Sequence, residues 1–347
     1  MSGEDELERF VAREDSRGEA RAREAPRRFE PGELVACEEC LRANAPTRMS
    51  CLYCGAALPM TERSAELRRP PLRRLEEWER GFNVVLRPTP SGPAPETMEE
   101  AASLLRLDAE RLAEIVESRA SLPVARAASE EEAGLIVKRL AAHGLAAEVF
   151  TDEALAHAPT RVRALGFEPD ALVLMPTAEA EPARVAWEEV ALLVEGRVVT
   201  KRVEFEERPS KLASRSQFVE AREVASDEAV LDVYTSGEEG GGFRVMADGF
   251  DYSCLGEKKG LLARDNFKRL IAELLARAPR AAFDEEYARL RGPLSCVWPP
   301  AERTESGGLR RDRPGRLNTE SVTVVSNEGQ FTRYARLRWR LALRARE

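Results

Sequence analysis

Four of the six cysteines stand close together in the first part of the chain. Cys37, Cys40, Cys51 and Cys54 follow the spacing C-x2-C-x10-C-x2-C. A C-x2-C pair on a tight turn can aim two thiolates at one ion, and a second such pair completes the tetrahedral shell of four ligands that Zn²⁺ prefers. Gly55 directly follows the second pair and allows the positive φ that such a turn needs. We therefore predict one metal ion bound by these four thiolates.

Three other chemistries use the same ligands. A disulfide needs an oxidising compartment, which nothing in the sequence indicates. A redox-active C-x-x-C lies within a βαβ pattern, and neither pair has such a pattern around it. Iron in a rubredoxin-like shell uses identical ligands and stays an alternative. The two histidines, His143 and His157, lie far downstream, so we expect an all-cysteine shell with Zn²⁺ as the cofactor.

The segment 34–60 resembles the short zinc ribbons of many bacterial proteins. The resemblance rests on the two cysteine pairs and on the run Cys-Leu-Tyr-Cys-Gly-Ala-Ala-Leu-Pro at 51–59. It implies a structural site with a full shell and no open position for a catalytic water. A metal of this kind folds a segment that is too small to fold alone. Some ribbons also bind nucleic acid or a protein partner.

Length and composition limit the class of protein. The chain has 347 residues, of which 43% are hydrophobic and 33% charged, and its net charge is −8. This length predicts two or three domains. The acidic balance argues against wrapping nucleic acid. We find no run near the ~18 apolar residues of a membrane helix, and the acidic start of the chain is unlike a secretory signal. These features predict a cytoplasmic protein.

The cysteine segment is expected to lie between two polar stretches, a disordered charged arm at 1–33 and a linker at 61–80. Residues 81–151 then predict a small α+β domain with the order strand, helix, helix, strand, helix, strand. Ser129 and Glu132 have the spacing of a capping box. Gly144 is placed to end the helix that Ser129 begins.

This element order resembles the compact domain shared by the ClpS adaptor and the C-terminal domain of the ribosomal stalk protein. The run that carries the likeness is 122–150, where a capped helix, a glycine and a strand follow one another. The resemblance implies a small protein-docking module. ClpS-type recognition uses an acidic Asn-Asp-Asp run after the first strand. Residues 87–90 read Arg-Pro-Thr-Pro instead, so that binding site is not transferred.

Residues 160–290 predict seven short strands, the last of them at 250–255, followed by one amphipathic helix. Turns are expected at 168–170, at Glu195–Gly196 and at 240–242. The helix is marked by apolar residues at helical spacing over 267–275. This pattern resembles a pleckstrin-homology-like barrel with a final helix at one open end, and the run 185–190 is similar to a strand of bacterial members. The resemblance implies binding and not catalysis. The first turn is acidic, which argues against lipid headgroups.

Residues 291–347 are expected to form a linker and a basic amphipathic tail. Over 330–343 the alternation of Leu with Arg suits a strand, whereas the spacing of Phe331, Tyr334 and Leu341 favours a helix. The candidate contacts for nucleic acid or another anion are Arg333, Arg336, Arg338 and Arg340. The alternative is that this segment packs on the preceding domain while its guanidinium groups reach solvent.

We find no nucleophile elbow and no phosphate-binding loop, and no catalytic residue is proposed. The expected fold is multidomain α+β: a zinc ribbon, a small β-α-α-β-α-β domain, then a mostly antiparallel β barrel or sandwich capped by a C-terminal helix. The expected function is a zinc-binding, non-catalytic adaptor or scaffold that docks protein partners. The alternatives are a ribosome- or nucleic-acid-associated protein that uses the ribbon and the Arg-rich tail, and an enzyme of unrecognised type.

Overall fold

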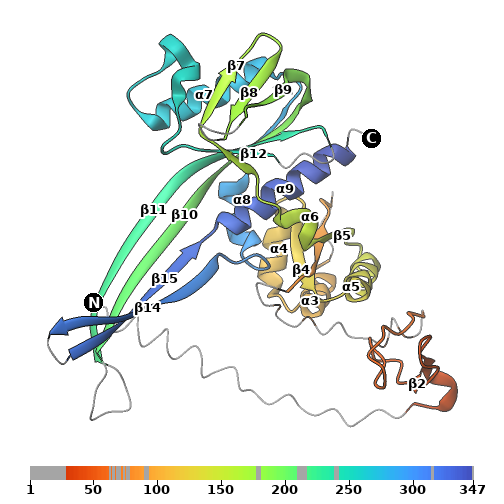
Figure 1. The fold of residues 1–347 in the computed structure, drawn as a ribbon. Helices are drawn as coiled ribbons and strands as arrows, with labels where there is room; N and C mark the ends of the chain where they lie inside the picture. The colour runs from red at the N-terminus through yellow and green to blue at the C-terminus, as the bar shows by residue number, and fades with distance from the viewer. Residues whose placement is uncertain are drawn as a thin grey trace. The chain divides into compact units, whose positions relative to one another are not determined.

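The chain is mixed α+β and divides into two compact units, Met1–Arg69 and Pro70–Glu347 (Figure 1). The predicted arm lies outside the described residues up to residue 28, as does most of the predicted linker. The computed structural model describes residues 29–61, 64, 67, 72, 75, 79–89, 94–176, 181–208, 217–237, 242–313 and 316–345.

The first unit is built around a very small core. Strands β1 (Val35–Ala36) and β2 (Ala43–Asn44) pair antiparallel, and a 3-10 turn, η2 (Pro31–Glu33), precedes them. The buried apolar side chains are those of Val35, Cys37, Cys51 and Leu58. A core of this size supplies little hydrophobic stabilisation, so the segment depends on a further cross-link.

The second unit begins with the predicted small α+β arrangement. The order strand, helix, helix, strand, helix, strand is confirmed, and the three strands form an antiparallel sheet in the order β4-β3-β5. The resemblance to the ClpS and stalk-protein domain stays a prediction. The elements are β3 (Phe82–Leu86), α3 (Pro95–Leu105), α4 (Ala109–Glu117), β4 (Leu122–Ala127), α5 (Glu130–Ala142) and β5 (Ala147–Thr151).

Helix α5 begins and ends near the predicted residues. The Ser129 hydroxyl accepts a hydrogen bond from the backbone N–H of Glu132 at 3.2 Å, which is one half of a capping box. The reciprocal bond differs, because the Glu132 carboxylate accepts from the backbone N–H groups of Ala128 and Leu72. Gly144 follows the helix with φ +73°, as expected of a left-handed C-terminal residue.

The rest of the second unit centres on a seven-stranded sheet in the order β14-β15-β10-β11-β12-β6, with β13 also pairing with β10. A separate three-stranded sheet, β7-β8-β9, encloses one core together with it, and the two curl as a half-barrel. The elements are α6 (Asp152–Ala156), β6 (Thr160–Val162), β7 (Ala164–Phe167), β8 (Ala171–Met175), β9 (Ala183–Ala186), η3 (Trp187–Glu189), β10 (Val190–Arg208), β11 (Gln217–Thr235), β12 (Phe243–Met246), η4 (Tyr252–Lys258), α7 (Ala263–Arg277), β13 (Ala282–Asp284), α8 (Tyr287–Leu294), β14 (Ala301–Arg313), β15 (Arg316–Ser326) and α9 (Glu328–Arg344).

The prediction of a turn at Glu195–Gly196 is wrong. Strand β10 passes through both residues without interruption and pairs with β11 on either side of them. The glycine serves close packing: a Cβ on Gly196 would lie 2.4 Å from Cε2 of Phe331 and 3.1 Å from Cδ1 of Tyr287. The predicted strand at 250–255 is also wrong, since η4 occupies most of this run.

The side chains of β10 contribute to two different hydrophobic cores. Leu192 and Val194 belong to the core that α8, α9 and the small α+β sheet share, whereas Leu193 belongs to the core that α7 covers. Val190 also faces that second core, because a β-bulge separates it from Leu192. Successive side chains of a strand point to opposite faces, so one pair of strands serves as the wall between both cores. The expected domain boundary at residue 291 therefore does not separate two cores.

The segment expected to begin as a linker after residue 291 contains a β-hairpin of β14 and β15, and β15 includes the run 322–325, whose valines favour a strand. Of the two alternatives for 330–343, strand and helix, the structure has the helix, as part of α9. The expected helix over 267–275 is confirmed as part of α7. Likeness to a pleckstrin-homology-like barrel stays a prediction. None of the helices in the described ranges has the length and hydropathy needed to cross a bilayer.

A buried ion pair fixes α9 on the large sheet. Arg244 and Asp232 face each other from neighbouring strands, with Nε–Oδ1 and Nη2–Oδ2 distances of 2.7 and 2.8 Å. The same guanidinium donates to the Thr332 hydroxyl at 3.0 Å and to the Glu328 carboxylate at 3.2 Å, both on α9. Because each polar atom in this pair has a partner, we assign it a structural role.

Candidate metal centre

The two cysteine pairs form turns of equal geometry. The backbone N–H of Leu41 donates to the carbonyl of Cys37 at 2.9 Å, and that of Gly55 donates to the carbonyl of Cys51 at 3.0 Å. The residue after each pair has a positive φ, +59° at Leu41 and +78° at Gly55. The expectation for Gly55 is confirmed. In the turn of the first pair, the equivalent position is occupied by Leu41, although a positive φ favours glycine.

These turns bring the four sulfur atoms together. All four Sγ atoms lie within 4.8 Å of one another. The Sγ–Sγ distance is 3.6 Å for Cys37 and Cys54 and 3.5 Å for Cys40 and Cys51. A tetrahedral Zn²⁺ with ligands at ~2.3 Å has sulfur–sulfur edges of about 3.8 Å. The arrangement therefore fits a four-coordinate metal ion, and in the described part of the chain it is the sole His, Cys, Asp or Glu cluster that does.

A buried asparagine orients one of the ligands. Asn44, 4% exposed, lies at the end of β2 between the two cysteine pairs. Its Nδ2 donates to Sγ of Cys51 at 3.4 Å, and its Oδ1 accepts from the backbone N–H of Leu52 at 2.9 Å. Hydrogen bonds of this kind fix the direction of a ligand and stabilise its thiolate form. The sequence reading missed Asn44, whose one signal is its place between the pairs.

The hydrogen-bond donors act unequally on the four thiols. Desolvation raises the pKa of Cys51, but donors from the backbone of Tyr53 and Cys54 and from the Asn44 amide outweigh it and lower that pKa to about 6. A backbone donor at Ala56 lowers the pKa of Cys54, whereas desolvation and the neighbouring sulfurs raise it to about 12. Four thiolates in one shell repel one another, and a divalent cation removes that repulsion.

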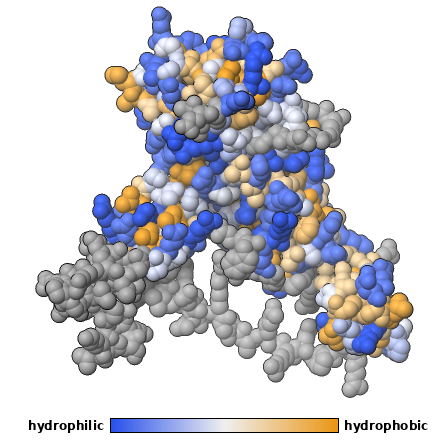
Figure 2. Space-filling view, viewed as in Figure 1, coloured by the Kyte–Doolittle hydropathy of each residue, from blue (hydrophilic) through white to orange (hydrophobic). Residues whose placement is uncertain are grey.

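Apolar side chains surround this centre on the outside of the unit. Leu41, Leu52 and Tyr53 are 81%, 64% and 55% exposed, and all three lie in or directly after the cysteine turns. The Arg42 guanidinium lies over the Tyr53 ring at 4.7 Å from its centroid and so links the two turns. Figure 2 shows hydrophobic and hydrophilic residues side by side on the visible face of this unit.

The other two cysteines have a different environment. Burial raises the pKa of Cys254 to about 11 and also raises the pKa of Cys296. Both thiols are half-buried, and neither joins the metal-ligand cluster. A raised pKa leaves little of each thiol in the thiolate form at neutral pH, and the thiolate is the reactive form.

The four arginines of the tail lie on α9, mostly turned into the fold. The Nε of Arg336 donates to the Ala154 carbonyl at 3.4 Å, and Arg338 pairs with Asp284 at 2.6 Å. The guanidinium groups of Arg336 and Arg340 lie against the Trp339 ring. Arg333 is half-buried. The side chains that were candidates for binding an anion therefore take part in packing.

No protein-family model, no curated protein and no solved structure matches this chain. A shell of four cysteines leaves no ligand position for water, so its chemistry is the binding of a metal ion and the folding that this binding drives.

Proposed function

We propose that Cys37, Cys40, Cys51 and Cys54 bind Zn²⁺ and that the protein is a non-catalytic adaptor whose ribbon docks a partner protein. Zinc suits an all-thiolate tetrahedral shell with hydrogen bonds to its sulfurs, and it has no redox chemistry of its own. With the ion bound, the two turns become one rigid surface. Iron in the same shell is the alternative, and elemental analysis of the purified protein distinguishes the two.

The observation that carries the docking proposal is the conformation of Leu41. A β-carbon at φ +59° costs roughly 1–2 kcal/mol, and the equivalent residue of the second turn is a glycine. Leu41 nevertheless presents an 81% exposed side chain, which contributes little to the fold. An apolar side chain that is strained and exposed at once fits a contact with another molecule better than a packing role.

The surroundings of Leu41 indicate the chemistry of that partner. Glu38 and Glu39 are exposed between the two cysteines of the same turn. Leu52 and Tyr53 occupy the corresponding places in the second turn. We therefore propose a protein partner with an apolar patch and a basic rim, since charges of opposite sign favour encounter and register. A nucleic acid would be repelled by these carboxylates.

The alternative of a ribosome- or nucleic-acid-associated protein receives less support. Arg336 and Arg338 are engaged within the fold, so replacing them with Ala tests stability before it tests binding. The enzyme alternative receives no support from Cys254 or Cys296, because burial raises the pKa of both thiols.

The test is affinity capture of the full chain from native lysate, with Leu41→Asn as the diagnostic variant. Asparagine accepts a left-handed conformation, so this variant keeps the turn and the metal while it removes the apolar contact. The matched control is Leu261→Asn, because Leu261 is a fully exposed leucine of the second unit. Bound metal is measured in every sample.

We expect the wild type and Leu261→Asn to capture the same basic protein at both low and high salt, and Leu41→Asn to lose it while retaining one metal ion. Cys51→Ser with Cys54→Ser is expected to lose both the metal and the partner. Equal capture by Leu41→Asn and wild type would refute docking through this turn. Full metal content in the double serine variant would refute the zinc site.

A further inference from the structure

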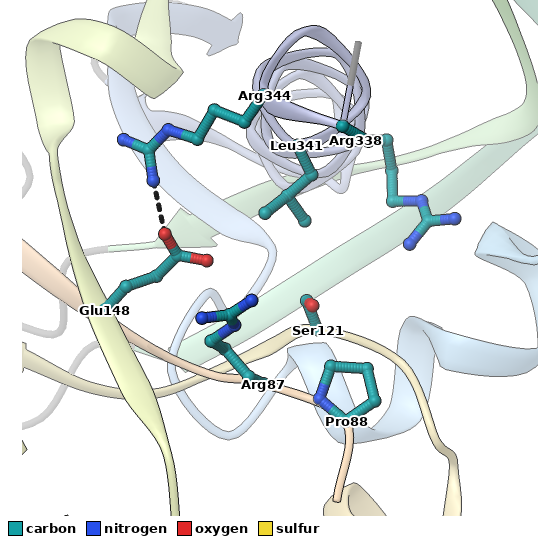
Figure 3. A pocket seen from close by; sticks show the side chains of 8 residues that line it. Arg87, Pro88, Ser121, Glu148, Arg338, Leu341 and Arg344 are labelled. Atoms are coloured by element: carbon teal, nitrogen blue, oxygen red, sulfur yellow. Dashed lines mark hydrogen bonds and ion pairs between the residues drawn. The ribbon is translucent and has the colours of Figure 1, made fainter. Parts of the chain in front are cut away.

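A cavity of about 440 Å³ lies between the small α+β sheet and the C-terminal end of α9, far along the chain from the cysteines (Figure 3). Arg87 and Pro88 enter it directly after β3, Ser121 directly before β4, and Glu148 from β5. The register of the sheet brings these residues together, because Leu86 pairs with both Leu122 and Ala147. Helix α9 contributes the other wall through Arg338, Leu341 and Arg344, together with Ala345 directly after the helix.

Three guanidinium groups and one carboxylate line this cavity, and two of the guanidinium groups are already paired. Arg344 donates to the Glu148 carboxylate, and Arg338 donates to Asp284 at 2.6 Å. The Arg87 guanidinium has neither a hydrogen bond nor an ion pair with the residues that the structure describes. Among the described residues that line the cavity, Arg87 is therefore the one guanidinium without an acidic partner.

Figure 3 shows how the remaining groups are arranged. The Arg87 side chain reaches into the space between Glu148 and Leu341, and the Ser121 hydroxyl lies near it. The backbone of Arg87 is held in place, since its N–H donates to the Ala146 carbonyl at 2.8 Å. Ser121 is 7% exposed and so belongs to the floor of the cavity. Leu341 and Pro88 provide apolar surface beside these polar groups.

We propose that this cavity binds a small organic anion, with Arg87 pairing with its carboxylate or phosphate group and its apolar body lying against Leu341 and Pro88. A guanidinium offers a planar fork that matches either oxyanion with two parallel hydrogen bonds. The Ser121 hydroxyl supplies a further donor. A concave site of this volume, in which a few convergent polar groups lie beside apolar surface, is typical of small-molecule binding. The inference does not depend on the ribbon or on its metal.

Three probes that share a phenyl ring test the proposal on the full chain at matched ionic strength. They are benzoate, phenyl phosphate and neutral benzyl alcohol. Saturation-transfer difference NMR detects weak binding of each probe and gives its dissociation constant. The diagnostic variant is Arg87→Gln, in which an exposed side chain loses its charge while the backbone contact stays. The matched control is Arg163→Gln, an exposed arginine of the same unit that does not line the cavity.

We expect at least one anion to bind the wild type roughly tenfold or more tightly than benzyl alcohol, because a hydrogen bond to a charged group has that effect on affinity. Arg87→Gln should abolish this preference and Arg163→Gln should keep it. Preference for benzoate identifies a carboxylate ligand, and preference for phenyl phosphate identifies a phosphate ester. Equal binding of all three probes, no binding of either anion, or an unchanged preference in Arg87→Gln would overturn the proposal.

Discussion

The indole N–H of Trp298 donates a hydrogen bond to Oδ1 of Asn83 at 2.8 Å, and both side chains are fully buried. The Nδ2 of the same asparagine donates to Oδ1 of Asp152 at 3.0 Å and to the Phe150 carbonyl at 3.2 Å. The segment after α8 is thus joined to the central strand of the small α+β sheet by a satisfied polar contact within the core. This contact shows why residues 81–151 share one core with the C-terminal helices.

Replacing Asn83 with Ala should lower the free energy of unfolding by about 1–3 kcal/mol, because it leaves the Trp298 N–H buried without an acceptor. Trp298→Phe removes that donor together with part of the packing. The double variant should therefore be less destabilised than the sum of the two single variants. Urea unfolding of the four proteins measures the coupling, and strictly additive values would contradict the importance of this bond.

Gly196→Ala should destabilise the protein by about 1–3 kcal/mol, since the new methyl group would lie within 2.7 Å of two ring carbons of Phe331. The control is Gly134→Ala within α5, where a Cβ meets nothing within 4 Å. This second change should stabilise the protein by up to about 1 kcal/mol, because alanine favours a helix over glycine. Thermal unfolding measures both, and equal effects would contradict the close packing at Gly196.

Asn44→Ala should weaken metal binding by roughly 10–100-fold, because it removes the donor to the Cys51 sulfur and the acceptor that holds the Leu52 backbone. Competition with a chromophoric chelator measures the affinity. Arg48→Ala is the control, since Arg48 is exposed in the same unit and its Nε donates to the Ser50 carbonyl and not to a ligand sulfur. Equal affinities in the two variants would show that Asn44 has no part in the site.

Glu195→Gln should stabilise the protein at neutral pH. Partial burial, with the nearby Glu285 carboxylate, raises the pKa of Glu195, so the folded state binds this proton more tightly than the unfolded state does. The Glu195 carboxyl therefore contributes to the free energy of unfolding at low pH, and this contribution is lost as the pH rises through the pKa of Glu195 in the folded state. The gain in melting temperature for Glu195→Gln should shrink as the pH falls from 7 towards 4.

Exposed Glu188 supplies the control for that prediction, because Glu188→Gln alters a charge on the surface. Its melting temperature should stay close to that of the wild type across the same pH range. A gain for Glu195→Gln that is constant with pH would show that packing, and not the charge, is responsible.

Local patterns in the sequence were sufficient for the elements that depend on local interactions. Helix α5 begins after Ser129 and ends before Gly144, as predicted, because capping involves residues within one turn of each other. The four cysteines were identified by spacing alone, since the turn geometry at each pair is set by neighbouring residues. Asn44 was missed because its role depends on the fold between the pairs, which no short motif encodes.

Elements that depend on distant partners were predicted less well. Gly196 was taken for a turn residue, because a glycine next to a glutamate is common in turns, yet the rings that require it come from α8 and α9. The arginines of α9 were taken for surface groups, although Asp284 and the Ala154 carbonyl accept from two of them. A sequence pattern indicates which face of a helix is apolar and which is charged. It does not indicate which residues each face contacts.

The shared wall of β10 and β11 has a consequence for which changes this chain can tolerate. A substitution at Leu193 affects the core that α7 covers, and one at Val194 affects the core beneath α9, so each core can vary by itself. A single inserted or deleted residue in this run would instead exchange the two faces of the strand and move every later side chain into the opposite core. In this stretch, length is constrained far more tightly than composition.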